Sequence, residues 1–471
     1  DLEEAEPQRA GLYKGTAAAI VLPSSTKQVS QAVKICHHRG VAIVPQGGIT
    51  GRVGGATPDS ATHQVVINLK RMNRLRSVDP ADFTLTADAG CVLADVQAAA
   101  EQVNRLFPLR LGSEGSCQIG GNLASNAGGI NALRYGNARD LALGLEVVLA
   151  DGRVWNGLNR LRKNNSGYDL RDLFIGSEGT LGIITAAVLK LYPAPKGSAT
   201  AIIAVSDLHN ALKILTAARQ FCGETVTACE VICATGIQFA CEHIERCNDP
   251  FLAAHPSQNT RELAGGAGAW YLLIETSGQQ SSEQLSDSLI ACLEHCDEKS
   301  LYLDSLIAMN ERQREDFWRL REGVVEAQRF EGASIKHDIS LPVSAVPSFV
   351  DEVLPLITQR LPSIRPCPFG HLGDGNLHFN LSQPVDMDTN AFLARWDEFN
   401  ELVHDRVMAY GGSFSAEHGI GRMKRDELEQ RADPVGLEIM HKIKQALDPD
   451  QQLNPGKVLN SAIRLPNDYT D

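Results

Sequence analysis

Residues 45–55 read PQGGITGRVGG and follow an apolar run, residues 41–45, that is typical of a buried strand. The loop contains five glycines, whereas a tight turn needs only about one or two. Because glycine has no side chain, backbone N–H groups in such a loop can turn towards an anion and approach it closely. We therefore expect this loop to bind a phosphate group.

Two further glycine-rich stretches lie downstream. Residues 112–129 read GSEGSCQIGGNLASNAGG, and residues 176–184 read GSEGTLGII. Neither contains the G-x-G-x-x-G fingerprint of a Rossmann fold or the Lys-Ser/Thr ending of a nucleotide-triphosphate loop. Three separate loops suit a long, phosphate-containing cofactor that lies across a domain better than a single phosphate group.

Short apolar runs alternate with helical patterns around these loops, which predicts an α+β domain. The expected strands are residues 18–22, 41–45, 65–69, 83–87, 143–149 and 182–191, and the expected helices are residues 26–39 and 93–106. The stretch YPAPKG, residues 192–197, then reads as a linker.

A second sheet-and-helix domain is expected after the linker. Its expected strands are residues 199–206, 269–276 and 333–341, and its expected helices are residues 208–222, 281–296 and 311–329. A predicted helix over residues 434–447 closes the chain. We divide the chain into domains at residues 1–195, 196–415 and 416–471, which agrees with its length of 471 residues, because a single core stops growing at about 250–300 residues.

Composition excludes some kinds of partner. A net charge of −13 argues against nucleic acid, whose phosphates need a clustered excess of Lys and Arg. No window approaches 18 consecutive apolar residues, so no transmembrane segment is expected. We expect a cytoplasmic protein, and a mitochondrial targeting segment stays open because the chain starts at Asp1 rather than at a methionine.

The eleven cysteines show neither metal-ligand nor redox-dithiol spacing. Cys229 and Cys233, like Cys292 and Cys296, are four residues apart, which is helical spacing. We expect all eleven to be reduced thiols.

Histidines form the most specific chemical signal. Residues 371–378 read HLGDGNLH, and a two-residue turn at Asp374 and Gly375 would place His371 directly opposite His378 on neighbouring strands. Downstream, residues 415–421 read SAEHGIG and contribute a carboxylate and another imidazole. Two histidines and one glutamate are a ligand set of catalytic zinc sites, and nitrogen and oxygen ligands also suit manganese, iron or cobalt.

At these loops and histidines the chain resembles flavoproteins of the vanillyl-alcohol oxidase and p-cresol methylhydroxylase superfamily, and within it the FAD-linked D-lactate and D-2-hydroxyglutarate dehydrogenases. The resemblance extends over about residues 13–458. It implies a two-part FAD-binding domain of the p-cresol methylhydroxylase (PCMH) type, a substrate-binding cap domain with a metal-binding hairpin, and a C-terminal segment that returns to the flavin. The FAD contacts that it implies are Pro45, Gln46, Gly47, Gly48, Ile49, Thr50, Gly51, Gly55, Ser116, Gly120, Asn122, Asn126, Gly128, Gly182, Ile184 and Asn454.

The resemblance also implies the catalytic chemistry. His371, His378 and Glu417 match residues that bind a divalent metal, zinc being the first choice, and His418 matches the general base. The substrate-binding residues that it implies are Arg321, Lys336 and Asn380. Together these residues predict oxidation of a small D-2-hydroxy acid to a 2-oxo acid: the metal polarises the hydroxyl, His418 takes its proton, and flavin N5 accepts the hydride.

Two positions depart from the pattern of the family. Relatives usually carry Asn where this chain has Ile49, so the loss of one polar contact to FAD is expected. Some relatives that act on dicarboxylic hydroxy acids carry a hydroxyl side chain where this chain has Val325, which weakens the case for 2-hydroxyglutarate. No His or Cys matches the position of covalent flavin attachment, so FAD is expected to bind non-covalently.

By the same resemblance, the electron acceptor is an electron-transfer flavoprotein or a quinone-linked partner, and the oligomeric state, a homodimer included, stays open. Three other functions compete with the dehydrogenase. An oxidase would form peroxide rapidly during turnover. A non-redox FAD enzyme acting on a lipid precursor, or a catalytically silent flavin-binding subunit, would have little need of the histidine and glutamate set.

Overall fold

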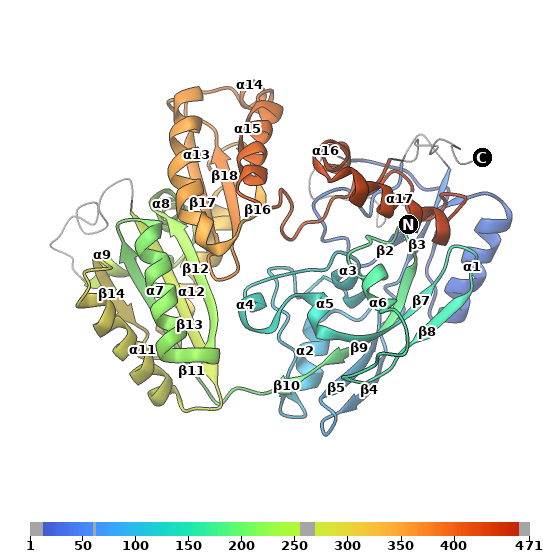
Figure 1. Ribbon diagram of the computed structural model, residues 1–471, viewed down its shortest axis with the longest axis horizontal. Coiled ribbons are helices and arrows are strands. Elements are labelled where there is room, and N and C mark those ends of the chain that lie inside the picture. The colour runs from blue at the N-terminus through green and yellow to red at the C-terminus, as the bar shows by residue number, and fades with distance from the viewer. Residues whose placement is uncertain (1–12, 60–62, 255–268, 461–471) are drawn as a thin grey trace. The chain divides into compact units, whose positions relative to one another are not determined.

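The computed structural model describes residues 13–59, 63–254 and 269–460 (Figure 1). The described chain folds as two compact units. The first unit takes in the described residues of Asp1–Gly129, Tyr135–Pro193 and Glu417–Asp471, and the second those of Ile130–Arg134 and Ala194–Ala416. Over the described ranges, no helix is both long and apolar enough to cross a membrane.

The first unit begins with a small parallel sheet, in the spatial order β1, β3, β2. Its elements are β1 (Ala19–Val21), α1 (Thr26–His38), β2 (Ala42–Gln46) and β3 (Gln64–Asn68). Helix α1 starts where the Ser25 side chain accepts a hydrogen bond from the backbone N–H of Gln28. Because β2 ends at Gln46, the first glycine loop begins at the carboxyl end of this strand.

An antiparallel sheet forms the larger part of the first unit. Its strands in spatial order are β4 (Leu75–Asp79), β5 (Thr84–Asp88), β9 (Ile183–Lys190), β7 (Ala142–Val148) and β8 (Val154–Gly157). Strands β7 and β9 are largely apolar and buried, as continuous apolar runs of this length predict. The other elements of this unit are α2 (Leu93–Glu101), β6 (Arg105–Leu106), α3 (Ile119–Ala124), α5 (Ala138–Leu141), α6 (Arg171–Phe174), β10 (Tyr192–Pro193), α16 (Arg425–Arg431) and α17 (Pro434–Leu447), and α4 (Ala132–Tyr135) spans the boundary.

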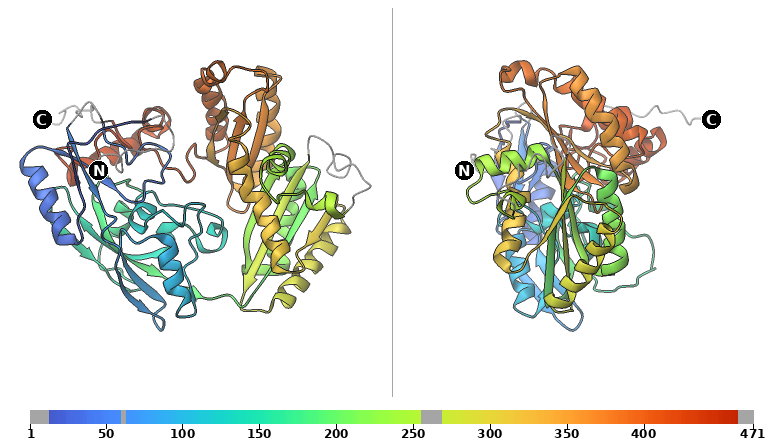
Figure 2. Two further views of the ribbon diagram at one scale, coloured as in Figure 1. Left: turned by 180° about the vertical axis from the view of Figure 1, so that it is seen from behind. Right: turned by 90° about the vertical axis from the view of Figure 1, so that its left-hand side faces the viewer.

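The second unit is built on one antiparallel sheet. Its strands in spatial order are β14 (Asp304–Ile307), β11 (Gly197–Val205), β13 (Trp270–Gly278), β12 (Val226–Cys233), β17 (Arg365–His371), β18 (Asn376–Ser382) and β15 (Ser334–Ile335), and β16 (Asp338–Ser340) also pairs with β18. Helices α7 and α11 pack together on one face of the sheet, and α8 and α12 pack together on the other (Figure 2). The helices are α7 (Leu208–Cys222), α8 (Ala234–His243), α9 (Pro250–Ala254), α11 (Ser282–Asp297), α12 (Glu311–Ala327), α13 (Val346–Arg360), α14 (Thr389–Leu393) and α15 (Trp396–Ala409).

The predicted α+β fold is confirmed, but three local predictions are wrong. The helix expected over residues 93–106 ends at Glu101, because Asn104 takes a positive φ of 56° and leads into β6. The strand expected over residues 333–341 is interrupted at residues 336–337 and forms two short strands, β15 and β16, which pair with β18 in the same register. Cys229 and Cys233 lie in strand β12 rather than in a helix, whereas Cys292 and Cys296 do lie in helix α11.

Candidate active site

Hydrogen bonds of the Gln46 side chain hold the first glycine loop, and this loop packs directly on the second. Gln46 is buried; its Nε2 donates to Ala56 O at 2.7 Å, and its Oε1 accepts from Asn68 Nδ2 at 3.3 Å. A Cβ atom at Gly48 would lie 2.2 Å from Ser116 O, so only glycine allows the two loops to meet. Part of the Gln46 side chain therefore shapes the loop itself.

Gln118, which the sequence did not single out, lies beside the first loop. A Cβ atom at Gly47 would be 3.5 Å from Gln118 Oε1. That oxygen is buried and accepts no hydrogen bond from any described residue. Buried acceptors in folded proteins are nearly always paired, so Gln118 Oε1 fits a donor on a bound cofactor, such as a ribityl hydroxyl of FAD. In the sequence, the only sign of this role is that Gln118 is a polar residue between the apolar residues Cys117 and Ile119.

Asn454 joins the first glycine loop to the third. Its Nδ2 donates to Gly55 O at 2.9 Å and to Glu178 O at 2.8 Å. Its Oδ1 is buried and, within the described chain, without a hydrogen-bond partner, so this acceptor also fits a cofactor donor. The third loop rests on the second, because Glu178 N donates to Ala124 O at 2.8 Å. The three loops and Asn454 thus meet in one place of the first unit.

Several residues predicted to bind the cofactor have only some of their atoms available for contact with a ligand. A Cβ atom at Gly182 would lie 2.5 Å from Val147 Cγ1, and the Ile184 side chain is in the core, so both can reach a cofactor only through their backbone. Asn126 Oδ1 accepts a hydrogen bond from Arg139 N at 3.0 Å. Ile49 takes a positive φ of 55°, a strained conformation for a β-branched residue and one that Asn tolerates well.

Glu178 holds the backbone that follows His418. Its Oε1 accepts from Ile420 N at 2.7 Å, and its Oε2 accepts from Gly421 N at 2.9 Å. Burial raises the pKa of this carboxyl to about 7, although the two amide hydrogen bonds and the charge of Lys424 act to lower it. The loop that starts at His418 is therefore fixed to the third glycine loop within the first unit.

The histidine hairpin does not have the predicted two-residue turn. In the β17–β18 ladder His371 pairs with Asn376 and His378 pairs with Phe369, so residues 372–375 form the connection. The turn is wider because Gly373 N donates to Cys229 O on strand β12 at 3.1 Å instead of pairing across the hairpin. The expected direct opposition of His371 and His378 is wrong, but both side chains share one face, with ring centroids 5.8 Å apart.

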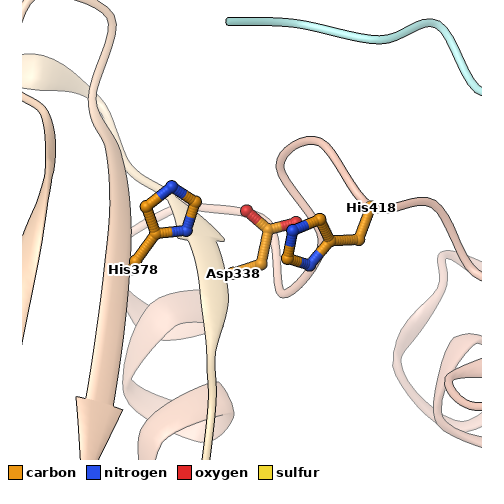
Figure 3. A group of neighbouring side chains, drawn as sticks. All are labelled: Asp338, His378 and His418. Atoms are coloured by element: carbon orange, nitrogen blue, oxygen red, sulfur yellow. The ribbon is translucent and has the colours of Figure 1, made fainter. Parts of the chain in front are cut away.

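The residues predicted to bind a metal come together. Potential ligand atoms of His371, His378 and Glu417 all lie within 4.8 Å of one another. Asp338 and His418 form a second such group with His378, and Figure 3 shows Asp338 between the two imidazoles. Glu417 and His418 directly follow Ala416, whose N–H donates to Asp338 O at 3.2 Å. Sequence reasoning assigned no role to Asp338.

Glu230 links a predicted metal ligand to a predicted substrate residue. Its Oε1 lies 2.7 Å from His371 Nδ1, and its Oε2 accepts a hydrogen bond from Arg321 Nε at 2.8 Å and forms an ion pair with Arg321 Nη2 at 2.8 Å. Burial opposes a charge on Glu230, but attraction to His371 in its protonated form, the charge of Arg321 and the hydrogen bonds with both residues outweigh it and hold the pKa of the carboxyl below its usual range. The signal in the sequence was a lone Glu inside the apolar strand Val226–Cys233.

The other predicted substrate residues differ in their surroundings. Asn380 is buried on β18, two residues after His378 and on the same face, and its Nδ2 donates to Gln328 Oε1 at 3.0 Å. Lys336 is exposed between β15 and β16. Val325 is partly buried on α12, one helical turn after Arg321.

Known proteins share this architecture. Two family models match the chain: the FAD binding domain over residues 17–157, and the C-terminal domain of FAD linked oxidases over residues 194–458. The solved structure of p-cresol methylhydroxylase with substrate bound gives a TM-score of 0.69 at 18% identity and covers 95% of this chain and 90% of that chain. Alkyldihydroxyacetonephosphate synthase gives a TM-score of 0.68 at 19% identity over 93% of this chain and 75% of that chain. At these identities, both likenesses show the fold alone.

Curated relatives are more similar in sequence. The probable mitochondrial D-2-hydroxyglutarate dehydrogenase of Oryza sativa subsp. indica is 39% identical over 454 residues, which cover 96% of this chain and 77% of the relative. The D-2-hydroxyglutarate dehydrogenase of Xanthomonas citri pv. viticola is 36% identical over 450 residues, which cover 94% of this chain and 89% of the relative.

The fold and the glycine-loop cradle define the class, a flavoprotein with p-cresol methylhydroxylase architecture and a FAD-binding domain. Within that class, the chain belongs to the family of FAD-linked oxidases and is a homologue of the FAD-dependent D-2-hydroxyglutarate dehydrogenases.

Proposed function

We propose that this chain is a dehydrogenase that uses non-covalent FAD and a divalent metal to oxidise a small D-2-hydroxy acid to the corresponding 2-oxo acid. The observation that carries the proposal is the group of His371, His378 and Glu417, whose potential ligand atoms lie within 4.8 Å of one another. Three protein ligands with an open position are the arrangement of a catalytic zinc site. Zinc is therefore the first metal to test, ahead of manganese, iron and cobalt.

Each bound group supplies one kind of chemistry. FAD, when bound, supplies the acceptor for the hydride that leaves C2 of the substrate. A divalent metal, when bound, supplies a Lewis acid that lowers the pKa of the substrate hydroxyl. His418 accepts the hydroxyl proton, because a neutral imidazole can serve as a general base at neutral pH. His371, His378 and Glu417 hold the metal. The adjacent residues Glu417 and His418 therefore have different roles, one in metal binding and the other in proton transfer.

Arg321 is the residue proposed to bind the substrate carboxylate. Its Nε and Nη2 both point to Glu230, so Nη1 is the guanidinium nitrogen best suited to the substrate. The amide of Asn380 and the ammonium of Lys336 are proposed as further polar contacts. One turn after Arg321, the apolar Val325 favours a small or apolar substrate side chain over a second carboxylate.

The relatives are named for D-2-hydroxyglutarate, so this acid and D-lactate are the two substrates to compare. The test is an anaerobic titration of the FAD-loaded enzyme with both D-acids and their L-enantiomers, followed by the flavin absorbance. We expect a D-acid to bleach the flavin and D-lactate to react better than D-2-hydroxyglutarate. Val325→Thr is expected to reduce that preference, and bleaching by none of the four acids would contradict the proposal.

The acceptor of the electrons is proposed from the resemblance alone, as an electron-transfer flavoprotein or a quinone-linked partner. Slow formation of peroxide in air, with fast transfer to an artificial acceptor, is the expected behaviour of a dehydrogenase. Fast peroxide formation at the same substrate concentration would favour an oxidase.

A further inference from the structure

Glu230 and His371 are direct partners across two neighbouring strands. The β12–β17 ladder places Glu230 opposite His371, although 141 residues separate them in the chain. Both side chains are buried, with 1% and 6% of their surfaces exposed. We propose that Glu230 is a positioning residue that selects which ring nitrogen of His371 binds the metal and holds Arg321 with the same carboxylate. The metal part of this inference rests on the proposed function.

The choice of ring nitrogen follows from the hydrogen bond. An ionised carboxylate only accepts, so the proton of a neutral His371 must lie on Nδ1, which is 2.7 Å from Glu230 Oε1. The lone pair is then on Nε2, and this nitrogen becomes the metal ligand. A carboxylate behind a metal-binding histidine fixes both the tautomer and the orientation of the ring.

The second carboxylate oxygen of Glu230 fixes the guanidinium of Arg321. Two nitrogens, Nε and Nη2, bind Oε2 at 2.8 Å, and the guanidinium carbon lies 4.9 Å from the centre of the Phe369 ring. Phe369 is itself in β17, two residues before His371. One carboxylate thereby sets the position of a metal ligand and of the residue proposed to bind the substrate.

A second buried pair on the same helix shows what a purely structural glutamate looks like. Glu275, on strand β13, accepts from Arg314 Nε at 2.8 Å and from Trp318 Nε1 at 2.7 Å. Arg314 and Arg321 both belong to α12, so each pair docks this helix on the sheet. No described histidine contacts Glu275. Loss of Glu275 should therefore disturb helix docking as loss of Glu230 does, but not the metal ligand.

Two matched variants test the inference in the full-length, FAD-loaded protein. Glu230→Gln keeps the size of the side chain but cannot accept hydrogen bonds through both of its end atoms, and Glu275→Gln makes the same change at the docking pair. After metal removal by a chelator, each protein is titrated with Zn²⁺ against a chromophoric competitor. We expect Glu230→Gln to weaken Zn²⁺ binding by about 10–100-fold and Glu275→Gln to bind Zn²⁺ as the wild type does. Equal Zn²⁺ affinities of Glu230→Gln and the wild type would overturn the inference, and so would equal losses in both variants.

A measurement on the wild type alone covers the case in which Glu230→Gln does not fold. Long-range ¹H–¹⁵N spectra of the metal-free protein report the tautomer of each histidine, and the signals of His371 are assigned by their loss in His371→Gln. At a pH at which His371 is neutral, we expect a protonated Nδ1 and an unprotonated Nε2. A proton on Nε2 would contradict the role of Glu230. Failure of the wild type to bind Zn²⁺ would instead contradict the proposed function, so the two failures are distinguishable.

Discussion

Glu178 Oε1 accepts a hydrogen bond from the backbone N–H of Ile420 at 2.7 Å. Because His418 lies two residues before Ile420, this bond ties the backbone of the proposed base to the third glycine loop within the first unit. Gly419 leaves room for the contact, since a Cβ atom there would lie 2.7 Å from the same carboxylate oxygen. The relationship gives the first prediction, which concerns pH.

Glu178 should make the stability of the protein fall as the pH rises. Burial raises its folded-state pKa to about 7, above its ordinary value of 4.5. A raised acid pKa contributes stability that is fully present below the unfolded-state value and is lost as the pH rises through the folded-state value. This contribution is at most about 3 kcal/mol. We expect urea unfolding at pH 5 and pH 8 to show a larger decrease for the wild type than for Glu178→Gln, and equal decreases would contradict this assignment.

Replacement of His418 by alanine should remove the base without removing FAD or the metal. Flavin reduction by the substrate is expected to slow by about 10²–10⁴-fold, the usual contribution of a general base. Stopped-flow absorbance under anaerobic conditions measures the rate, and flavin and metal contents serve as controls. A rate within about tenfold of the wild type would rule out His418 as the base, since it falls short of that contribution.

Two groups of potential metal ligands share His378, and one contains the carboxylate of Glu417 while the other contains that of Asp338. The two groups predict different effects on Zn²⁺ binding when these carboxylates are replaced. If Glu417 is the metal ligand, Glu417→Gln should weaken Zn²⁺ binding by more than the roughly 10–100-fold that loss of a supporting hydrogen bond costs. Asp338→Asn should keep the metal, because Asp338 belongs to the other group. Competition titrations with Zn²⁺ measure both affinities. A reversed order would assign the metal to Asp338, His378 and His418.

Gly48 and Gly51 differ in the room available for a side chain. A Cβ atom at Gly48 would lie 2.2 Å from Ser116 O, whereas none of the described atoms would come within 4 Å of a Cβ atom at Gly51. Gly48→Ala is therefore expected to cost about 1–3 kcal/mol of stability and to weaken FAD binding, because the first two glycine loops must move apart. Gly51→Ala is the control for stability. Thermal unfolding and flavin fluorescence test both variants, and wild-type behaviour of Gly48→Ala would contradict the close packing of the loops.

Replacement of Ile49 is expected to make the protein more stable. Its positive φ of 55° costs about 1–2 kcal/mol for a side chain of this kind, and both Asn and Gly relieve the strain. Ile49→Asn and Ile49→Gly should both raise the thermal midpoint of the FAD-free protein. Only Asn restores a polar side chain towards the cofactor, so tighter FAD binding is expected for Ile49→Asn alone. Unchanged midpoints in both variants would show that Ile49 is not strained.

The sequence predicted elements best where local signals mark both ends. Helix α7 has the predicted bounds because the Asp207 side chain caps its start and Gly223, at a positive φ, ends it. Helix α17 likewise begins with Pro434 in its first turn, after the capping Asp433. Strand β12 was missed because its cysteine spacing also fits a helix.

The roles of the candidate site residues were predictable only through the resemblance to the family. Glycine loops and the histidine pattern are visible in one sequence, and the resemblance assigned their roles. Long-range partners are not visible, because a strand register decides that Glu230 faces His371, and a hydrogen bond that Gly373 N donates to Cys229 O decides the shape of the hairpin. Contacts of this kind depend on the folded sheet, not on any local pattern.

The central claim is that FAD-dependent oxidation of a D-2-hydroxy acid requires the metal held by His371, His378 and Glu417. The most direct measurement compares anaerobic bleaching of the flavin by the preferred D-acid in three samples of the same enzyme: metal-loaded, chelator-stripped, and stripped then reloaded with Zn²⁺. We predict bleaching in the first and third samples and none in the second, with the flavin spectrum intact in all three before substrate is added. Full bleaching of a verified metal-free sample would contradict the account.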